Sequence, residues 1–250
     1  MHSARVWQVM FVVMVALSPA VVSDVAAGAT PGRAPSVAAE CPNGHVALTF
    51  DDGPDPVTTP QLVAALRAHD SRATFFMVGA DAQAHPDVVV RARAAGMEVG
   101  NHTYDHPFLD EQTERQVTDE LTTTTAILTG MGGPAPTLFR PPYGRSSAVV
   151  ERVAERLGLT LVLWSRDSDD YEEATPEAML AQAEKASDGE ILLYHDRFQS
   201  TVDAVPRILE VLAGRGLCAG RVLPSSTPRM AYLDYDGPDK TYFHAVAGPW

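Results

Sequence analysis

The chain has 250 residues, and 45% of them are hydrophobic. This is enough apolar material for one well-buried α/β domain, whereas two domains would be cramped. With 19 Lys and Arg against 32 Asp and Glu, the formal net charge is −13. Because proteins that bind nucleic acid present basic patches, this balance argues against a nucleic-acid partner and leaves neutral or cationic substrates open.

Residues 1–29 have the pattern of a signal peptide. Arg5 precedes the apolar run Val9–Leu17, and small residues lead up to Ala29. A transmembrane helix needs about 20 apolar residues, and Pro19 breaks this run before it reaches that length. We therefore expect cleavage after Ala29, a secreted protein and no stable membrane insertion. An uncleaved anchor is the alternative. Residues 30–40 then form a short flexible lead-in.

Cys41 and Cys218 are the two cysteines of the chain. In an oxidising compartment an even pair of cysteines is more often bridged than free, so export favours a disulfide between them. Two buried thiols are the alternative. A metal-binding role does not fit, because the two residues are isolated and far apart in the sequence.

Hydrophobic periodicity predicts strands and helices that alternate along most of the chain. In chain order we expect strand Val46–Phe50, helix Thr59–Ala68, strand Ala73–Val78, helix Asp87–Ala95, strand Met97–Gly100, helices Thr113–Thr129 and Ala148–Leu157, strand Leu159–Trp164, helix Pro176–Ala186, strand Glu190–Tyr194 and helix Thr201–Ala213. Such alternation implies a largely parallel sheet, and about six units suggest a closed or nearly closed (β/α) barrel.

Polar residues with chemical potential fall where the predicted strands end. They are Asp51, Asp52, Arg140, Trp164 and His195. In parallel α/β folds the functional site lies at the carboxyl ends of the strands. The predicted fold therefore brings these residues to one edge of the sheet.

His102 and His106 have the i, i+4 spacing with which two imidazoles reach one ion from a helical turn or a tight loop. On their own, a pair of surface histidines is the more common interpretation. Asp51 and Asp52, followed by Gly53, place two carboxylates on a sharp turn, although a plain polar turn has the same composition. A His₂Asp set leaves room for water and substrate, and the spare carboxylate suits a general base. Either aspartate fits either role.

These motifs resemble those of the polysaccharide deacetylases of the NodB-homology type, also called carbohydrate esterase family 4. The resemblance rests on the segments Thr49–Pro54, His102–His106, Arg140–Gly144, Trp164–Asp170 and Leu193–His195. It implies a seven-stranded distorted (β/α) barrel, an α/β fold, as the catalytic domain over residues 41–222. Residues 223–250 then form a tail of unknown role. The resemblance also implies that Cys41 and Cys218 form a disulfide, as cysteines at these places do in secreted members of the family.

The resemblance also implies the central chemical roles. Asp51 is expected to be the general base that takes a proton from water. A divalent metal, usually zinc and sometimes cobalt, is expected to be bound by Asp52, His102 and His106. His195 is expected to be the general acid that protonates the leaving amine.

Further residues are implied to shape the cleft. Arg140 is expected to orient Asp51, and the backbone N–H of Tyr143 to stabilise the oxyanion together with the metal. Trp164 and Leu193 are expected to wall the pocket for the acetyl methyl group. Leu193 is two residues from the catalytic histidine, so in a strand both side chains face the same side.

Asp170 matches the carboxylate that partners His195 in the family. A carboxylate there raises the pKa of the imidazole and keeps it protonated for acid catalysis. Asp167 and Asp169 compete for this role on sequence grounds. Arg72 is predicted either to hold that aspartate or to be an ordinary exposed arginine.

The resulting hypothesis is a secreted, metal-dependent polysaccharide deacetylase. We expect it to remove N-acetyl or O-acetyl groups from an acetylated polysaccharide or oligosaccharide, with N-acetylglucosamine glycans (chitin oligomers or peptidoglycan) preferred. We also expect a monomer that binds no nucleic acid. The alternatives are an acetylxylan esterase and a non-catalytic, secreted glycan-binding domain.

Overall fold

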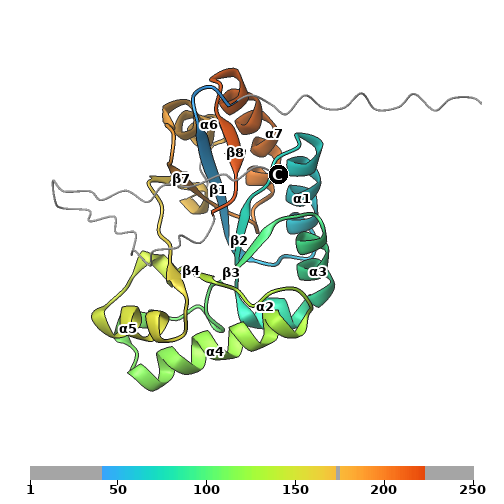
Figure 1. The fold of residues 1–250 in the computed structure, drawn as a ribbon. Coiled ribbons are helices and arrows are strands. Elements are labelled where there is room, and N and C mark those ends of the chain that lie inside the picture. Colours follow the sequence, from blue (N-terminus) through green and yellow to red (C-terminus); the bar gives the residue numbers. More distant parts are fainter. Residues whose placement is uncertain (1–40, 173–174, 223–250) are drawn as a thin grey trace, which may run out of the picture. The chain divides into compact units, whose positions relative to one another are not determined.

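The computed structural model describes residues 41–172 and 175–222. The predicted signal peptide, the lead-in and the tail over residues 223–250 lie outside the described residues. The strands form one parallel sheet, and helices pack around it (Figure 1). None of the helices in the described ranges has both the length and the apolar character that a membrane crossing requires.

Seven parallel strands follow one another in the order β5-β4-β3-β2-β1-β7-β6, and an eighth, β8, pairs with the first residues of β1. Their bounds are β1 His45–Gly53, β2 Thr74–Met77, β3 Glu98–Asn101, β4 Leu138–Phe139, β5 Thr160–Leu161, β6 Arg166–Asp167, β7 Ile191–His195 and β8 Cys218–Gly220. Across the described part of the chain no pairing joins β5 to β6, so the curled sheet stays open there. The predicted distorted (β/α) barrel is confirmed.

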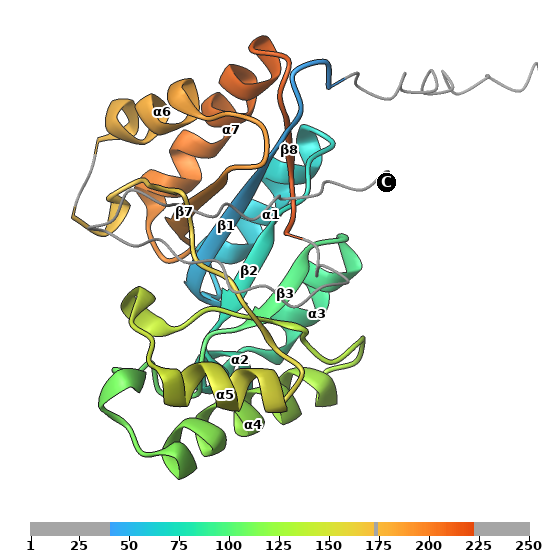
Figure 2. The ribbon, with the colours of Figure 1, turned by 60° about the vertical axis from the view of Figure 1, so that its left-hand side comes forward.

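Seven α-helices lie in the described ranges. They are α1 Thr58–Ala68, α2 Gly79–Ala84, α3 Pro86–Ala94, α4 Glu114–Gly130, α5 Ala148–Arg156, α6 Pro176–Lys185 and α7 Gln199–Gly214. Three short 3₁₀ turns join them, η1 Leu109–Glu111, η2 Pro142–Gly144 and η3 Asp170–Glu172. In Figure 2, α4 and α5 lie side by side, and α6 and α7 form a second pair.

The predicted strand Leu159–Trp164 is wrong in its length, because only Thr160–Leu161 forms β5. The reason lies in the carbonyl groups that follow. The side chain of Arg140 donates to the carbonyl oxygens of Val162 (3.2 Å) and Leu163 (2.9 Å). These acceptors therefore bind a guanidinium group and no neighbouring strand.

Helix α4 forms where it was predicted in spite of its many threonines. Thr113 precedes it and makes a capping box, in which its hydroxyl accepts from the N–H of Gln116 while the Gln116 side chain accepts from the N–H of Thr113. Thr118, Thr122 and Thr129 each donate their hydroxyl to the carbonyl four residues earlier. Hydroxyl groups that would otherwise compete with the helix are thus satisfied within it.

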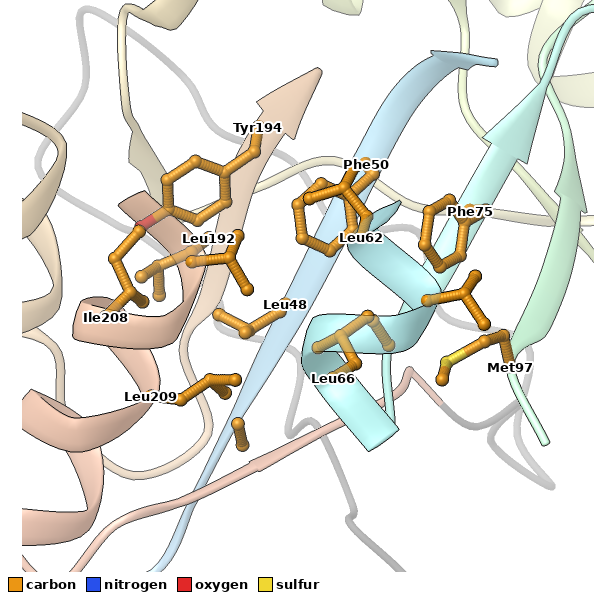
Figure 3. Packing of buried hydrophobic residues seen from close by; sticks show 14 of the residues in the cluster. Leu48, Phe50, Leu62, Leu66, Phe75, Met97, Leu192, Tyr194, Ile208 and Leu209 are labelled. Atoms are coloured by element: carbon orange, nitrogen blue, oxygen red, sulfur yellow. The ribbon is translucent and has the colours of Figure 1, made fainter. Parts of the chain in front are cut away.

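One face of the central strands forms the main hydrophobic core. Leu48 and Phe50 of β1 and Leu192 and Tyr194 of β7 lie in one buried cluster with residues of α1 and α7, such as Leu62 (Figure 3). Successive residues of a strand point to opposite faces. This face is therefore fully occupied by packing, and the chemistry must lie on the other one.

The other face collects the polar residues. The register of β1 and β7 pairs Thr49 with Leu193 and Asp51 with His195. These four alternate with the core residues, so their side chains point to the inner side of the curled sheet. The parallel register thus brings an aspartate and a histidine that are far apart in the sequence to one end of two adjacent strands.

The structure contains the predicted disulfide between Cys41 and Cys218, whose Cα atoms are 5.4 Å apart. Cys218 begins β8 and pairs in register with His45 of β1. The bridge therefore ties the first described residues to the last strand of the sheet.

Candidate active site

The Asp51-Asp52 pair lies in an irregular end of β1. The strand continues through Gly53, so the predicted sharp turn is in fact a bulge within the strand, and the register against β2 shifts between Phe50 and Gly53. Asp52 has φ of 69°, in the left-handed region. Aspartate tolerates this region better than most residues. The bulge lets the two neighbouring carboxylates take on different partners.

His102 and His106 lie in a tight loop after β3 rather than on a helix. Thr103 and His106 both have positive φ values, 67° and 57°. The loop is held by side chains: Asn101 Oδ1 accepts from the N–H of Thr103 (2.8 Å), and Thr103 Oγ1 accepts from the N–H of His106 (3.1 Å). Asn101 thus supports a turn.

The tautomer of His102 follows from its neighbour. Its Nδ1 lies 2.7 Å from the carbonyl oxygen of Arg140. A carbonyl oxygen only accepts, so Nδ1 carries a proton, and Nε2 is the ring nitrogen that faces Asp52. Histidines that bind metals are oriented in this way by a partner on the other ring nitrogen.

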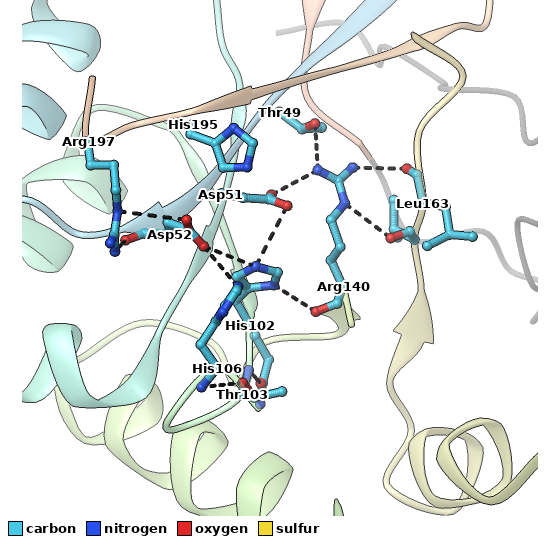
Figure 4. A network of polar contacts seen from close by, with 12 residues as sticks. Thr49, Asp51, Asp52, His102, Thr103, His106, Arg140, Leu163, His195 and Arg197 are labelled. Carbon is cyan, nitrogen blue, oxygen red and sulfur yellow. Dashed lines mark hydrogen bonds and ion pairs between the residues drawn. The ribbon is translucent and has the colours of Figure 1, made fainter. Parts of the chain in front are cut away.

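Asp52, His102 and His106 form a three-ligand cluster (Figure 4). Asp52 Oδ1 lies 3.5 Å from His102 Nε2 and 3.1 Å from His106 Nε2. Tetrahedral zinc, with bonds of about 2.0–2.1 Å to nitrogen and oxygen, separates its ligand atoms by roughly 3.3 Å. The donor types and their spacing therefore fit a divalent ion of this kind. Burial would raise the pKa of Asp52, but the hydrogen bonds and charges of the two histidines outweigh it, so the pKa lies well below its ordinary value.

Asp51 has a separate partner. Its Oδ1 accepts a hydrogen bond of 2.8 Å from Arg140, and its Oδ2 lies 3.7 Å from His102 Nε2. Arg140 is fully buried and also donates to Thr49 Oγ1 (2.8 Å). Its guanidinium lies over the ring of Phe76 at 4.3 Å. Burial lowers the pKa of Arg140, and the charge of Asp51 opposes that change.

His195 lies across from Asp51 and is held by Asp170. Its Nδ1 donates to Asp170 Oδ1 (2.7 Å), and its backbone N–H donates to Asp170 Oδ2 (2.8 Å). Thr201 completes the carboxylate with a 2.6 Å hydrogen bond to the same Oδ2. Burial would lower the pKa of His195, but the hydrogen bond and charge of Asp170 outweigh it and raise the pKa.

Among the three aspartates predicted to compete for His195, the geometry therefore selects Asp170. Asp167 and Asp169 make no hydrogen bond to the histidine in the described contacts, and Asp167 instead accepts from the N–H of Asp169 (3.0 Å). The expectation that Arg72 holds the aspartate is wrong, since its side chain donates to the carbonyl of Ser71 (3.0 Å).

Tyr143, predicted to lend its backbone N–H, lies at the rim of the site. It has φ of 60°, and its side chain is 57% exposed. Its ring packs between the rings of His106 (4.7 Å between centroids) and Phe108 (4.4 Å). A row of ring contacts, edge-on at His106 and tilted at Phe108, thus leads from the ligand cluster to two exposed aromatic side chains.

Trp164 and Leu193, predicted to wall the acetyl pocket, are both placed near the buried arginine. Trp164 lies 5.4 Å from the Arg140 guanidinium and packs so closely on Gly144 that a Cβ there would lie 2.8 Å from its ring. Leu193 is buried on the inner face of β7, opposite Thr49. Their roles toward a substrate stay predictions.

Two residues directly after His195 were missed by the sequence reasoning. The carboxyl group of Asp196 is buried against Gly53 and accepts from Thr59 Oγ1 (2.6 Å). Burial raises its pKa to about 8, against the opposing effects of Thr59 and Arg197. Arg197 contacts Asp52. The available signal was their position next to a histidine predicted to be catalytic, at the end of a strand.

A pocket of about 270 Å³ opens beside the ligand cluster. It is lined by Asp52, Val78, Ala80, Asp81, Tyr104, Asp105, His106 and Arg197. The lining is predominantly polar, and two of its members belong to the ligand cluster. The arrangement thus combines three side chains that could hold a metal ion, a buried carboxylate paired with an arginine, a histidine paired with a carboxylate, and space for a polar molecule.

Comparisons with known proteins find matches in both sequence and fold. The polysaccharide deacetylase family model matches residues 38–162. A solved structure of a family 4 carbohydrate esterase from Streptomyces lividans, in complex with acetate, matches with a TM-score of 0.72 and 41% identity, covering 77% of this chain and 99% of that one.

Curated relatives show the same relationship. A peptidoglycan-N-acetylglucosamine deacetylase of Bacillus cereus is 36% identical over 186 residues, covering 71% of this chain and 86% of the relative. The bifunctional xylanase/xylan deacetylase of Cellvibrio japonicus is 37% identical over 186 residues, covering 74% and 28%. The chain spans only 28% to 39% of the length of several larger relatives.

Proposed function

Since the chain belongs to the polysaccharide deacetylase family, we propose that it is a secreted, metal-dependent hydrolase that removes N-acetyl groups from a glycan containing N-acetylglucosamine. The observation that carries this proposal is the separation of two proton-transfer groups. Asp51 is paired with Arg140, and His195 is paired with Asp170, beside one ligand cluster. Hydrolysis of an amide needs both a base for the water and an acid for the amine.

The chain's own residues supply the proton transfers. A divalent ion held by Asp52, His102 and His106 would polarise the acetyl carbonyl and lower the pKa of a nearby water. Asp51 is the base, because Arg140 keeps one of its oxygens engaged and leaves Oδ2 facing the ligand cluster. His195 is the acid, because Asp170 raises its pKa and so favours the form that carries a proton on Nε2.

The surrounding residues position the acetyl group. The N–H of Tyr143 is proposed to donate to the developing oxyanion, since a preorganised backbone donor is an effective way to stabilise such charge. Trp164 and Leu193 form the apolar wall proposed for the methyl group. The exposed rings of Tyr143 and Phe108 offer flat apolar surface to a sugar outside the pocket.

Support for the substrate comes from the relatives. The Bacillus cereus relative is a peptidoglycan-N-acetylglucosamine deacetylase. The alternative is an O-acetyl group of xylan, which the Cellvibrio japonicus relative favours. The same base, acid and ligand cluster suit hydrolysis of an amide and of an ester. The two reactions differ in the leaving group, an amine or an alcohol, and in how strongly it needs the proton from His195.

Acetate release tests the proposal. The purified protein is stripped with a chelator, reloaded with Zn²⁺ or Co²⁺, and given chitin oligomers, peptidoglycan or acetylxylan. We expect metal-dependent release, fastest from an N-acetylglucosamine glycan. Faster release from acetylxylan would show that the substrate is an O-acetyl ester and not an N-acetyl amide. No release at full metal loading would favour a glycan-binding domain.

A further inference from the structure

The chain that follows β7 crosses directly over the bulge that carries Asp51 and Asp52. After His195, the backbone N–H of Asp196 donates to the carbonyl of Asp51 (3.0 Å). The next residue, Arg197, reaches back over Asp52, and both appear with their contact in Figure 4. The bulge is therefore held from outside by the segment that also carries the proposed acid.

Arg197 binds Asp52 at two different atoms. Its Nη2 donates to the backbone carbonyl of Asp52 (2.6 Å), and its Nε lies 3.7 Å from Asp52 Oδ2. The Oδ1 atom of the same carboxylate faces His102 and His106. The two carboxylate oxygens thus have separate partners, one on the arginine and one in the ligand cluster.

A second carboxylate fixes the arginine itself. Arg197 Nη2 lies 3.5 Å from Asp81 Oδ2, and the Arg197 side chain is 44% exposed. Asp81 belongs to α2, which follows β2, so the contact joins the segment after β7 to the other side of the bulge. Arg197, Asp81 and Asp52 also line one pocket.

We propose that Arg197 is a positioning residue for the metal ligand Asp52. By engaging Oδ2 and the backbone carbonyl, it keeps the carboxylate turned so that only Oδ1 points at the two histidines. It thereby sets the affinity of the cluster for a divalent ion. The inference rests on the metal-dependent function proposed above.

Two effects of Arg197 on metal affinity oppose each other. Its positive charge repels a cation, but the guanidinium is partly exposed and its field is screened by solvent. Its contacts hold a ligand residue whose left-handed backbone is strained and needs support from its surroundings. Loss of a partner that orients a metal ligand typically weakens metal binding about 10-fold to 100-fold. We expect the positioning effect to be the larger.

The experiment is a zinc titration of the full-length protein in competition with a chromophoric chelator. Arg197→Ala is expected to raise the zinc Kd about 10-fold to 100-fold. Arg197→Gln is neutral but still donates a hydrogen bond, so it separates charge from contact and is expected to bind zinc more tightly than Arg197→Ala. Arg207→Ala is the matched control, because that exposed arginine of α7 pairs only with the nearby Glu210 in the described contacts.

The result that overturns the proposal is an unchanged or lower zinc Kd in Arg197→Ala, since charge repulsion would then dominate. Thermal unfolding of the metal-free variants shows whether the fold is intact. Acetate release is measured separately at saturating zinc, so that a loss of zinc affinity is distinguished from a loss of the reaction itself. If the wild type releases no acetate yet the zinc Kd responds as expected, the proposed function fails and the positioning role stands.

Discussion

At the scale of single residues, the site divides two neighbouring aspartates between two tasks. Asp51 is buried and bound to Arg140, whereas Asp52 lies beside His102 and His106. This division follows from the bulge, because a regular strand would point consecutive side chains to opposite faces of the sheet. The left-handed residue in the bulge brings both carboxylates to the same edge.

The assigned division predicts distinct effects of substitution. Asp51→Asn is expected to lower kcat by about 10²-fold to 10⁴-fold, since the proposed general base is lost, while the zinc Kd stays close to that of the wild type. Steady-state kinetics at saturating zinc and a zinc titration measure the two. Asp203→Asn, an exposed aspartate on α7, is the control. Near-wild-type kcat in Asp51→Asn would remove the base assignment.

The His195–Asp170 pair predicts a pH dependence. Asp170 raises the pKa of His195 against the effect of burial. A raised folded-state pKa adds stability that is fully present below the unfolded-state pKa, about 6.5, and is lost as the pH rises through the folded-state pKa. In Asp170→Asn we therefore expect the alkaline limb of the kcat/KM profile to move to lower pH. The stability lost in the variant should be greatest below pH of about 6.5 and should shrink above it.

Denaturant titrations across this pH range, with the pH profile of acetate release, measure both effects. Asp169→Asn is the control, because Asp169 is exposed and makes no described contact with His195. An alkaline limb that stays in place in Asp170→Asn would contradict the assignment of His195 as the acid.

At the scale of elements, the length of each helix or strand decides whether the sequence predicts it. Helices such as α4 and α7 repeat their apolar pattern over several turns, so each was predicted within one or two residues of its ends. Strands β4 and β6 have two residues each, and two residues carry no periodicity. Their positions are set by tertiary contacts, as β5 shows, where the buried Arg140 binds the carbonyls that a longer strand would use.

The candidate site shows the same limit. Motif residues predicted to meet do lie together, because parallel register carries the strand ends to one edge. The orientation of Asp52 was not predictable, since it depends on a bulge and on Arg197, which belongs to no motif. Thr201, which holds Asp170, resembles any helix threonine in the sequence.

The capping box of α4 predicts a local stability effect. Thr113→Ala removes the hydroxyl that accepts from Gln116 and is expected to lower the free energy of unfolding by about 1 kcal/mol. Thr122→Ala is the matched control in the same helix. Its hydroxyl bonds only within the helix in the described contacts, and alanine is the better helix former, so no loss is expected. Urea unfolding measures both, and equal losses would contradict the capping role.

At the scale of the whole molecule, the disulfide links the two ends of the described domain. Cys41 precedes β1 and Cys218 begins β8, with 177 residues of separation between them. A link across so long a loop strongly lowers the entropy of the unfolded chain. In the chain-entropy model this stabilises the folded state by about 5 kcal/mol. Strand β8 has three residues, and within the described part of the chain its sheet pairing is limited to the first residues of β1.

The double variant Cys41→Ser, Cys218→Ser is therefore expected to lose about 2–5 kcal/mol of unfolding free energy, measured by denaturant titration against the oxidised wild type. Reduced wild-type protein is the control, and it should match the variant if the bond itself is responsible. The active-site residues lie at the opposite ends of β1 and β7 from the bridge. We thus expect kcat to change little at temperatures where the variant is folded. A large fall in kcat in the folded variant would contradict this expectation. It would show that the bridge also positions the far end of β1, where the proposed catalytic residues lie.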